Sequence, residues 1–456
     1  MADRLVVVGG NGAGMSAASQ ARRLDPGLEI VVLEAGRQTS YSNCGFPFVI
    51  GGQVDSLDQL VVRTPAEARH EFNIDARIGH RVEELDLAQG DLEVRDLSRR
   101  RSYRLRFDQL VLATGAKPRR PDIPGIDLPH VHGIQTFAQA EGLVSALDQT
   151  RLSGGRAGAA AVVVGAGYIG LEMAEALCRL GLRVTVVTST PEVMPSLDSD
   201  VGALVTKAMR SRGIQVQCGT EVEGIEEKAV VTAQGLVPAD LVVLGAGVSP
   251  DVDLADGAGI EIGPSGAIGV NARMHSAVDA VWAAGDCAES FHLVSRRAVH
   301  VALGTVANKQ GKVAGTNLGG GYATFPGVLG TAVTGICEVE VARTGLNSTE
   351  AAEAGLAWAE AAVKSTLRPG YMPDPGSITI KMLAERRTGR LLGCQIVGSK
   401  GAAKRIDTVA VALSTGMSGE ELAGVDMSYS PHVSPLWDPV LIAARRVAEA
   451  AGRASN

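Results

Sequence analysis

Two glycine-rich segments, each directly after a short apolar run, constrain the fold of this chain more than any other feature. The first spans residues 5–14 and the second spans residues 161–170. Each is followed by a helical pattern and another apolar run, which is typical of a strand–turn–helix–strand unit. Glycines in such a turn let a pyrophosphate approach the main chain, where N–H groups at the helix start stabilise it. Two such units predict two dinucleotide sites in an α/β fold.

The two turns differ at one position of the G-x-G-x-x-G pattern. The second turn has glycine at all three positions, whereas the first has asparagine at the middle one. A glycine-rich turn can be a simple structural bend, but two of them between a strand and a helix favour binding. We expect six residues to lie at the phosphates of two dinucleotides: Gly9, Asn11, Gly14, Gly165, Gly167 and Gly170.

The residue after the second strand of each unit bears on which nucleotide is bound. The strand 29–33 ends at Glu34, where a carboxylate can receive ribose hydroxyls; a solvated strand-end charge is the alternative. The strand 183–187 is followed by Thr188-Ser189-Thr190. Thr188 is expected at the nucleotide. This segment contains no acidic residue to repel a 2′-phosphate and no arginine to bind one. The sequence therefore does not decide between NADH and NADPH.

Composition excludes several classes of protein. At 456 residues the chain is too long for one hydrophobic core, so two or three domains are expected. A net charge of -7 gives no broad basic surface for nucleic acid, and no apolar run approaches the length of a membrane span. The N-terminus runs straight into an expected strand and leaves no room for a signal peptide, so a reducing cytoplasm is expected.

The cysteines are widely spaced. The six are Cys44, Cys178, Cys218, Cys287, Cys337 and Cys394. No two form a CxxC or CxxxxC pair, so a disulfide framework, a zinc site and an iron–sulfur cluster are disfavoured, and no metal is expected. Any thiol chemistry must be performed by one cysteine without a near neighbour in sequence.

The remaining pattern divides the chain into three parts. Residues 117–124 are rich in proline and arginine and are typical of a crossover between the two units, and residues 240–250 of the crossover back. From about Thr324, alternating strand-like runs precede a helical run at 402–413, which indicates an α+β domain. We expect two dinucleotide-binding domains and a C-terminal domain with these bounds: 1–119 with 251–323, 120–250, and 324–456.

Three motifs outside the glycine turns carry a family likeness. They are Leu112-Ala-Thr-Gly115, Pro121-x-Ile-Pro-Gly125 and Val281-Trp-Ala-Ala-Gly-Asp286. With them the chain resembles the pyridine nucleotide-disulfide oxidoreductases over nearly its full length. The resemblance implies that the first unit binds FAD, that the second binds NAD(P)H, and that the C-terminal domain forms a homodimer.

The resemblance also implies roles for individual residues. Asp286 is expected at the ribityl–phosphate part of the flavin, with Thr114 and Gly115 at the same cofactor. Tyr168 is expected to gate the nicotinamide pocket, and Glu172 to lie close to the flavin. Without the resemblance, Tyr168 would be interpreted as a packing residue at a helix start and Glu172 as an exposed helical acid.

The segment from Ser40 to Gly52, Ser-Tyr-Ser-Asn-Cys-Gly-Phe-Pro-Phe-Val-Ile-Gly-Gly, resembles the single-cysteine branch of this family. That branch contains coenzyme A-disulfide reductases, NADH oxidases and NADH peroxidases. Two-cysteine members have a second cysteine at position 49, which is valine here. Cys44 is therefore the expected redox cysteine, and Asn43 with the turn at Gly45 is expected to supply donors that lower its pKa. We interpret the other five cysteines as small buried hydrophobes.

One glycine and two tyrosines separate the members of the branch. Gly12 stands where the oxidases and peroxidases usually have a histidine. Tyr429, in the segment 426–439, and Tyr371 resemble tyrosines that coenzyme A-disulfide reductases place in the active site of the partner subunit. The sequence therefore favours a disulfide reductase whose active site is shared across a two-fold interface.

Three further residues match positions that face the substrate in those reductases: Ser40, Arg22 and Arg23. For the two arginines, a solvated basic helix end is the alternative. Phe72 stands where a basic residue is expected, which leaves the identity of the thiol open.

The leading hypothesis is an FAD-dependent NAD(P)H:disulfide oxidoreductase. It would reduce coenzyme A disulfide or persulfide, with Cys44 resting as a mixed disulfide with a small thiol. An NADH oxidase or peroxidase on the same scaffold is the nearest alternative. A flavoprotein redox sensor or electron carrier is an alternative of another class, and it would need no reactive cysteine.

Overall fold

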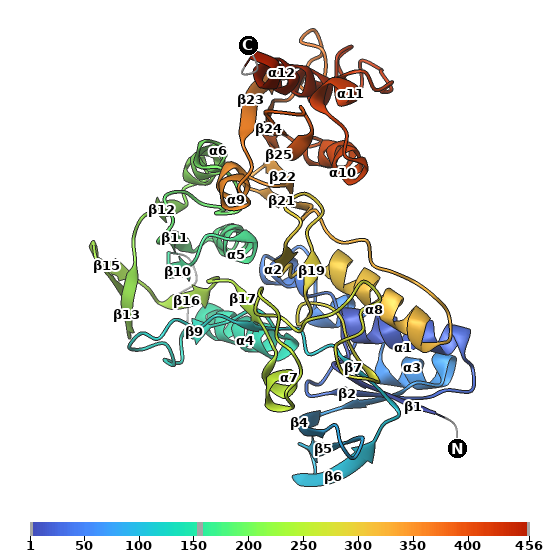
Figure 1. Ribbon diagram of the computed structural model, residues 1–456. Helices are drawn as coiled ribbons and strands as arrows, with labels where there is room; N and C mark the ends of the chain where they lie inside the picture. Colours follow the sequence, from blue (N-terminus) through green and yellow to red (C-terminus); the bar gives the residue numbers. More distant parts are fainter. Residues whose placement is uncertain (1–2, 153–157, 454–456) are drawn as a thin grey trace.

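The computed structural model describes residues 3–152 and 158–453, which form three sheet-based parts (Figure 1). The first part is a five-stranded parallel sheet assembled from two pieces of the sequence. In spatial order its strands are β18 (Val281–Ala283), β7 (Gln109–Leu112), β1 (Arg4–Val8), β2 (Glu29–Glu34) and β3 (Asp75–Ile78). The central strands are runs of valine, leucine and isoleucine because nearly all of their side chains are buried, as in a parallel sheet covered on both faces.

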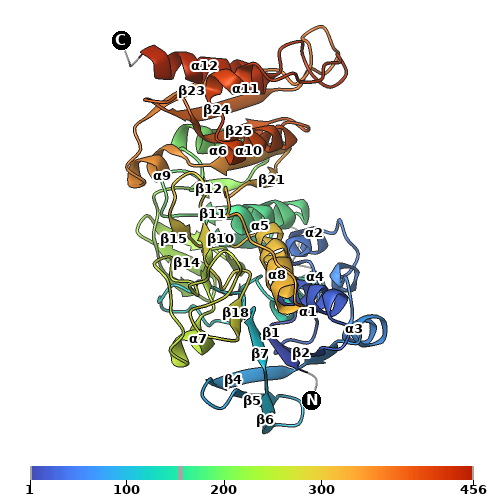
Figure 2. The same cartoon turned by 45° about the vertical axis from the view of Figure 1, so that its right-hand side comes forward.

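Helices α1 (Gly12–Leu24) and α8 (Gly304–Leu318) pack against each other beside this sheet (Figures 1 and 2). Glycines in α8 permit the close approach. A Cβ at Gly311 would lie 2.2 Å from the carbonyl oxygen of Ala13, and one at Gly315 would lie 2.3 Å from that of Ala17. The packing fixes the start of α1, which begins directly at the first glycine turn with Asn11 as its N-cap.

The second part is another five-stranded parallel sheet. Its order is β12 (Gln215–Gln217), β11 (Arg183–Val187), β10 (Ala160–Val164), β16 (Leu241–Leu244) and β9 (Val131–His132). Its helices are α4 (Phe137–Leu152), α5 (Tyr168–Arg179) and α6 (Ser199–Ser211). The two expected crossovers lie side by side as the antiparallel strands β8 (Ala116–Pro118) and β17 (Val248–Pro250).

The third part is a five-stranded antiparallel sheet with helices beside it (Figure 2). Its order is β21 (Ala332–Ile336), β22 (Val339–Gly345), β25 (Leu391–Gly398), β24 (Ile378–Glu385) and β23 (Trp358–Ser365). The helices are α9 (Ser348–Glu353), α10 (Ile406–Thr415), α11 (Gly419–Ala423) and α12 (Pro439–Arg453). The predicted fold class, two dinucleotide-binding units and an α+β domain, is confirmed. The exact domain bounds stay predictions.

Several small elements were not predicted from the sequence. Two three-stranded antiparallel sheets are β4 (His80–Asp86), β5 (Asp91–Asp96) and β6 (Arg101–Arg106), and β13 (Val222–Glu226), β14 (Ala229–Thr232) and β15 (Gly235–Pro238). The others are α2 (Phe46–Ile50), α3 (Pro65–Phe72), α7 (Asp253–Gly257), β19 (Ser290–Phe291) and β20 (Ala298–Val299). Within the described ranges, no helix has both the length and the apolar character needed to cross a membrane.

The first glycine turn allows a sharp stability test. Gly9 has φ +105°, and a Cβ there would lie 2.1 Å from the carbonyl oxygen of Ala113. Gly9→Ala is therefore expected to lower the free energy of unfolding by about 3 kcal/mol or more. The variant is also expected to lose its bound FAD. Denaturant unfolding and flavin absorbance measure the two effects. Gly12→Ala is the control, since its Cβ would meet only side-chain atoms at ordinary contact distance, Asn308 Nδ2 at 3.5 Å and Ala307 Cβ at 3.9 Å. Equal behaviour of the two variants would contradict the prediction.

Candidate active site

Cys44 lies on a short turn that is anchored from one side. It occupies the single 3₁₀ turn Asn43–Gly45, directly before α2, and its side chain is exposed. Phe46, the next residue but one, is fully buried, with its ring centroid 5.9 Å from that of Tyr41 and 6.2 Å from that of Phe137. The aromatic anchor holds α2 in place and so presents the thiol at the surface of the turn.

Asn11 ties the first glycine turn to the cysteine segment. Its Nδ2 donates to Asn43 Oδ1 at 2.8 Å, and its Oδ1 accepts from the backbone N of Tyr41 at 3.1 Å. Asn43 Nδ2 in turn donates to the carbonyl of Gln135 at 2.9 Å. The sequence predicted that the amide of Asn43 would donate to the thiol. The amide instead bonds to Asn11 and Gln135 and so fixes the turn. Asn11, the residue that breaks the glycine pattern, thus links the first glycine turn to the turn that carries Cys44. The spacing of these residues in the sequence does not reveal this contact.

The pKa of Cys44 is raised, whereas the motif around this residue predicted a lowered pKa. Although the residue is exposed at the surface, desolvation by the protein atoms packed around the sulfur is the largest cause, followed by the negative charge of Glu172. The residue's own backbone N–H opposes these effects, and Asp286 raises the pKa further. The expectation was wrong in sign because desolvation outweighs the backbone donor, and two carboxylates remote in sequence add to the rise.

Glu172 and Asp286 are themselves held partly out of water. Burial raises the pKa of Asp286 to about 6. Burial also raises the pKa of Glu172, although the hydroxyl of Thr334 donates to its Oε1 at 2.6 Å and opposes the rise. Glu172 comes from α5 of the second part and Asp286 follows β18 of the first part, so the Cys44 site lies where the two dinucleotide units meet.

A charge-neutral variant tests this electrostatic arrangement. Since the carboxylate of Glu172 opposes ionisation of Cys44, Glu172→Gln is expected to lower the thiol pKa and to move the pH profile of alkylation by iodoacetamide to lower pH. The rate is measured on the reduced, FAD-loaded protein across the neutral and alkaline range. Glu175→Gln is the matched control on the same helix, because Glu175 accepts from the backbone N of Cys337 instead. A profile that stays in place, or moves upward, would contradict the assignment.

The residues of the first turn fit a flavin dinucleotide. Glu34 accepts from the backbone N of Gly10 at 2.8 Å and of Gly36 at 2.6 Å, which places its carboxylate beside the turn. A Cβ on Gly14 would lie 1.9 Å from the carbonyl oxygen of Gly9, so the helix start needs glycine there. Gly115 has φ +76° and free space where a side chain would stand. Together with the partly buried carboxyl group of Asp286, these features fit the backbone binding of phosphates at a glycine turn.

Thr114 and Ser40 have their own structural tasks beside the first glycine turn. The hydroxyl of Thr114 donates to the carbonyl of Asp251 at 2.6 Å and so holds the two crossovers together. Ser40 has φ +51°, and its backbone N donates to the carbonyl of Gly10 at 2.9 Å. Their predicted cofactor and substrate contacts stay predictions.

The second turn leaves room at the start of α5. A Cβ on Gly170 would lie 2.2 Å from the carbonyl oxygen of Gly165, and one on Gly165 would lie 2.4 Å from that of Gly245. A Cβ on Gly167, in contrast, would meet nothing within 4 Å. The outer two glycines thus allow close backbone packing, and the middle one leaves open space for a pyrophosphate at the helix N-terminus.

The strand end of the second unit carries hydroxyl groups. Thr188 is buried, and its Oγ1 lies 2.8 Å from Thr190 Oγ1. Thr190 Oγ1 donates to the carbonyl of Glu192 at 2.8 Å. Position 188 therefore presents neither a carboxylate nor a guanidinium, which keeps both nicotinamide nucleotides open.

Arg22 is occupied by backbone carbonyl groups. Its guanidinium donates to the oxygens of Phe72 (3.0 Å), Asn73 (2.9 Å), Pro26 (2.7 Å) and Asp25 (3.4 Å). These contacts favour a structural role for Arg22 over the predicted substrate contact. Arg23 is exposed and donates to Gln20 Oε1 at 2.7 Å, so it stays a substrate candidate. A basic group that the sequence pattern did not reveal is Arg63, whose guanidinium carbon lies 4.0 Å from the ring centroid of Phe72. Arg63 thus supplies a positive charge beside position 72.

Tyr371 and Tyr429 lie together although 57 residues separate them in sequence. Both are exposed, by 74% and 46%. The pKa of Tyr371 is raised by a small desolvation and by a hydrogen bond with Tyr429. In both views the loops that carry them belong to the C-terminal domain, away from α2 (Figures 1 and 2). Three neighbours in sequence of Tyr429 are also exposed: Val433, Leu436 and Trp437.

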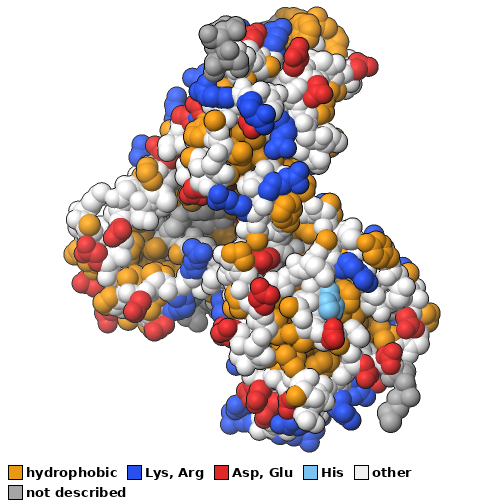
Figure 3. Space-filling view, viewed as in Figure 1, with side chains coloured by type: hydrophobic (Ala, Val, Ile, Leu, Met, Phe, Trp, Pro, Cys, Tyr) orange, Lys and Arg blue, Asp and Glu red, His pale blue; other side chains and the backbone are white. Residues whose placement is uncertain are grey.

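The surface has no single dominant charge on the face that Figure 3 shows, where acidic and basic side chains intermingle over all three parts. Among the described residues, no three histidine, cysteine, aspartate or glutamate side chains are grouped to hold a metal ion.

Comparison with known protein families agrees with this geometry. Residues 3–311 match the pyridine nucleotide-disulphide oxidoreductase family, and residues 331–439 match its dimerisation domain. The chain belongs to this family. Enzymes of the family use FAD and NAD(P)H, and the predicted family membership is confirmed. The match to the dimerisation domain indicates a homodimer.

Two sequence relatives and one solved structure are similar to this chain over nearly its full length. It is 36% identical over 449 residues, 98% of both chains, to an NAD(P)H coenzyme A polysulfide/persulfide reductase of Pyrococcus horikoshii. It is 35% identical over 446 residues, 97% of this chain and 98% of the other, to an NADH oxidase of Methanocaldococcus jannaschii. The structure of an NAD-dependent persulfide reductase from A. fulgidus superimposes with a TM-score of 0.93 at 37% identity, over 97% of this chain and 82% of that one.

Proposed function

We propose that the protein is an FAD-dependent NAD(P)H:disulfide oxidoreductase that reduces coenzyme A disulfide or coenzyme A persulfide through Cys44. The observation that carries the proposal is the position of this cysteine. Cys44 is exposed on a turn that Asn11 ties to the first glycine turn. The charges of Glu172 and Asp286, one from each dinucleotide unit, raise its pKa. The other cysteines are intermediate or buried.

A single sulfur suffices if the substrate supplies the second one. FAD, when bound, supplies the conversion of a hydride from NAD(P)H into two electrons for a disulfide. Cys44 holds the thiol R as a mixed disulfide, and two electrons break that bond into the Cys44 thiolate and RS⁻. The thiolate attacks RSSR and releases a second RS⁻, which restores the mixed disulfide. The sum is NAD(P)H + H⁺ + RSSR → NAD(P)⁺ + 2 RSH.

The raised pKa of Cys44 fits this cycle. A thiolate at this position is disfavoured by desolvation and by the like charges of Glu172 and Asp286, whereas the two sulfurs of a mixed disulfide carry no charge. The protein's own groups thus favour the disulfide as the resting state and make the freed thiolate a reactive nucleophile.

The second subunit completes the site in this proposal. Tyr371 and Tyr429 lie close together, exposed, and beside exposed apolar residues of the same segment, which supports their insertion into a partner. In the space-filling view, hydrophobic side chains are visible at the outer end of the C-terminal domain (Figure 3). Tyr429 would donate a hydrogen bond or proton to the departing RS⁻ of the partner's site. A reducing cytoplasm, which is part of this proposal, suits such a thiol-based cycle.

An NADH oxidase is the second candidate, because a relative at 35% identity carries that name. Gly12 argues for the reductase, since no imidazole stands in the first turn to serve peroxide or oxygen chemistry.

Steady-state oxidation of NADH and of NADPH tests the proposal. The acceptors are coenzyme A disulfide, coenzyme A persulfide, other small disulfides, O₂ and H₂O₂. We expect the highest kcat/KM with one of the two coenzyme A compounds. A higher value with O₂ would establish the oxidase instead, and turnover with none of the sulfur compounds would overturn the proposal.

A further inference from the structure

The loop between β11 and α6, residues 188–198, connects the second glycine turn with the C-terminal domain. Inside the turn, the carbonyl of Ala166 accepts from the backbone N of Met194 at 2.8 Å. Met194 is 1% exposed and has φ +56°, a conformation that surrounding contacts must enforce for a side chain other than glycine. The position of the turn therefore depends on what holds this loop.

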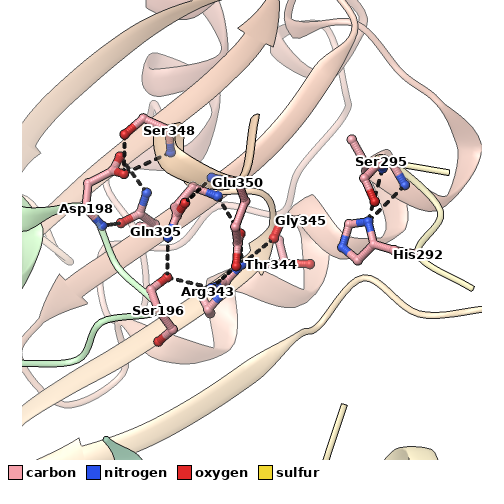
Figure 4. Close-up of polar contacts among 12 residues, drawn as sticks. Ser196, Asp198, His292, Ser295, Arg343, Thr344, Gly345, Ser348, Glu350 and Gln395 are labelled. Atoms are coloured by element: carbon pink, nitrogen blue, oxygen red, sulfur yellow. Dashed lines mark hydrogen bonds and ion pairs between the residues drawn. The ribbon is translucent and has the colours of Figure 1, made fainter. Parts of the chain in front are cut away.

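Arg343 of β22 holds the loop two residues further on. Its Nη1 donates to the carbonyl of Ser196 at 2.6 Å, and Asn347 Nδ2 donates to the same oxygen at 3.2 Å (Figure 4). The guanidinium is buried, and Glu350 accepts from both of its terminal nitrogens, at 3.1 and 2.6 Å. Its Nη2 also donates to the carbonyl of Gly345 at 2.6 Å. One rigid fork thus makes four bonds, which a lysine could not reproduce.

A second contact anchors the far end of the loop. The carboxylate of Asp198 accepts from the backbone N and the hydroxyl of Ser348, at 2.9 and 2.6 Å, and from Gln395 Nε2 at 2.9 Å. The ammonium group of the buried Lys381 lies 3.1 Å from the same carboxylate. Figure 4 shows Ser196 and Asp198, at the end of this loop, each with its own polar partners from the C-terminal domain.

Tyr168, the first residue of α5, also lies against this network. Its hydroxyl is buried and has no hydrogen-bond partner at bonding geometry, and the same holds for the hydroxyl of Ser196. Burial raises the pKa of Tyr168, the nearby Ser196 and Arg343 oppose the rise, and Glu350 adds to it. Arg343 therefore has two effects near the second glycine turn. It holds the supporting loop through the carbonyl of Ser196, and its charge affects the pKa of Tyr168 at the start of α5.

We propose that Arg343 is a positioning residue for nicotinamide nucleotide binding: through the carbonyl of Ser196 it fixes the loop that supports the second glycine turn. The inference rests on the proposed function, in which this turn binds NAD(P)H. It goes beyond that function in assigning part of the nucleotide affinity to the C-terminal domain of the same subunit.

The test compares Arg343→Lys and Arg343→Met with the wild type as FAD-loaded, full-length proteins. Binding of NAD⁺ and NADP⁺ is measured by calorimetry, and anaerobic flavin reduction by NADH and NADPH in a stopped-flow instrument. We expect Kd to rise about tenfold in Arg343→Lys, the loss of one bond to a charged donor, and further in Arg343→Met. The limiting rate of flavin reduction at saturating nucleotide and the KM for the disulfide stay at the wild-type values.

Arg405→Lys is the matched control. Arg405 is also poorly exposed, pairs with Asp438 and donates to backbone carbonyl groups of Gly401 and Val433, but it makes no contact with residues 188–198 in these bonds. It should keep the wild-type Kd. An unchanged Kd in Arg343→Lys beside normal binding by the wild type overturns the role of Arg343 alone. Equal losses in the two lysine variants would show general destabilisation and overturn it too. Absence of nucleotide binding by the wild type overturns the proposed function itself.

Discussion

Replacing Cys44 by serine is expected to lower turnover with coenzyme A disulfide or persulfide on the order of a thousandfold or more. A serine hydroxyl neither ionises near neutral pH nor forms a sulfur–sulfur bond, so neither half of the cycle can proceed. Binding of FAD and its reduction by NAD(P)H should persist, because Cys44 is exposed and no cofactor cradle depends on its side chain.

The two halves are measured separately. Disulfide-dependent NAD(P)H oxidation reports the thiol chemistry, and anaerobic bleaching of the flavin reports the hydride step. Cys178→Ser is the matched control, since this cysteine is partly accessible but lies on α5, with its sulfur 3.7 Å from the carbonyl oxygen of Arg212. It should retain wild-type turnover. Equal turnover of Cys44→Ser and the wild type would falsify the single-cysteine mechanism.

The parts of the structure that the sequence predicted are those set by local pattern. A valine-rich run followed by Gly9 or Gly165 encodes a strand, a positive-φ turn and a helix start within ten residues, and both units fold as expected. The small antiparallel sheets, β4–β6 and β13–β15, were missed because their short strands are only partly buried and lack a long apolar run.

The site was harder to predict, because its chemistry depends on contacts between distant residues. The pKa of Cys44 is raised first by desolvation and then by the charges of Glu172 and Asp286, which lie 128 and 242 positions further along the chain. Arg22 stands at a position that the resemblance assigned to substrate binding. Its guanidinium instead donates to backbone carbonyl groups of the same domain. A motif gives the residue type at a position, whereas the partners of that residue are known only after folding.

Hybrid dimers give the second large effect. Tyr429→Phe is expected to lower disulfide turnover about a hundredfold, since the departing thiolate loses its hydrogen-bond or proton donor. A hybrid of one Cys44→Ser subunit and one Tyr429→Phe subunit, purified through two different tags, should recover about half of the wild-type activity. One of its two sites then combines an intact Cys44 with an intact Tyr429 from the opposite subunit, and the other site lacks both.

This recovery separates a shared site from one built within a subunit. If Tyr429 served the Cys44 of its own chain, each subunit of the hybrid would carry one defect, and activity would stay at the level of the parent variants. The control is a hybrid of Cys44→Ser with a subunit that carries both substitutions, which should remain inactive because no intact Cys44 is present. Full turnover by the Tyr429→Phe homodimer would remove this residue from the site. The exposed pair of tyrosines, together with the exposed Val433, Leu436 and Trp437 beside them, leads us to expect recovery.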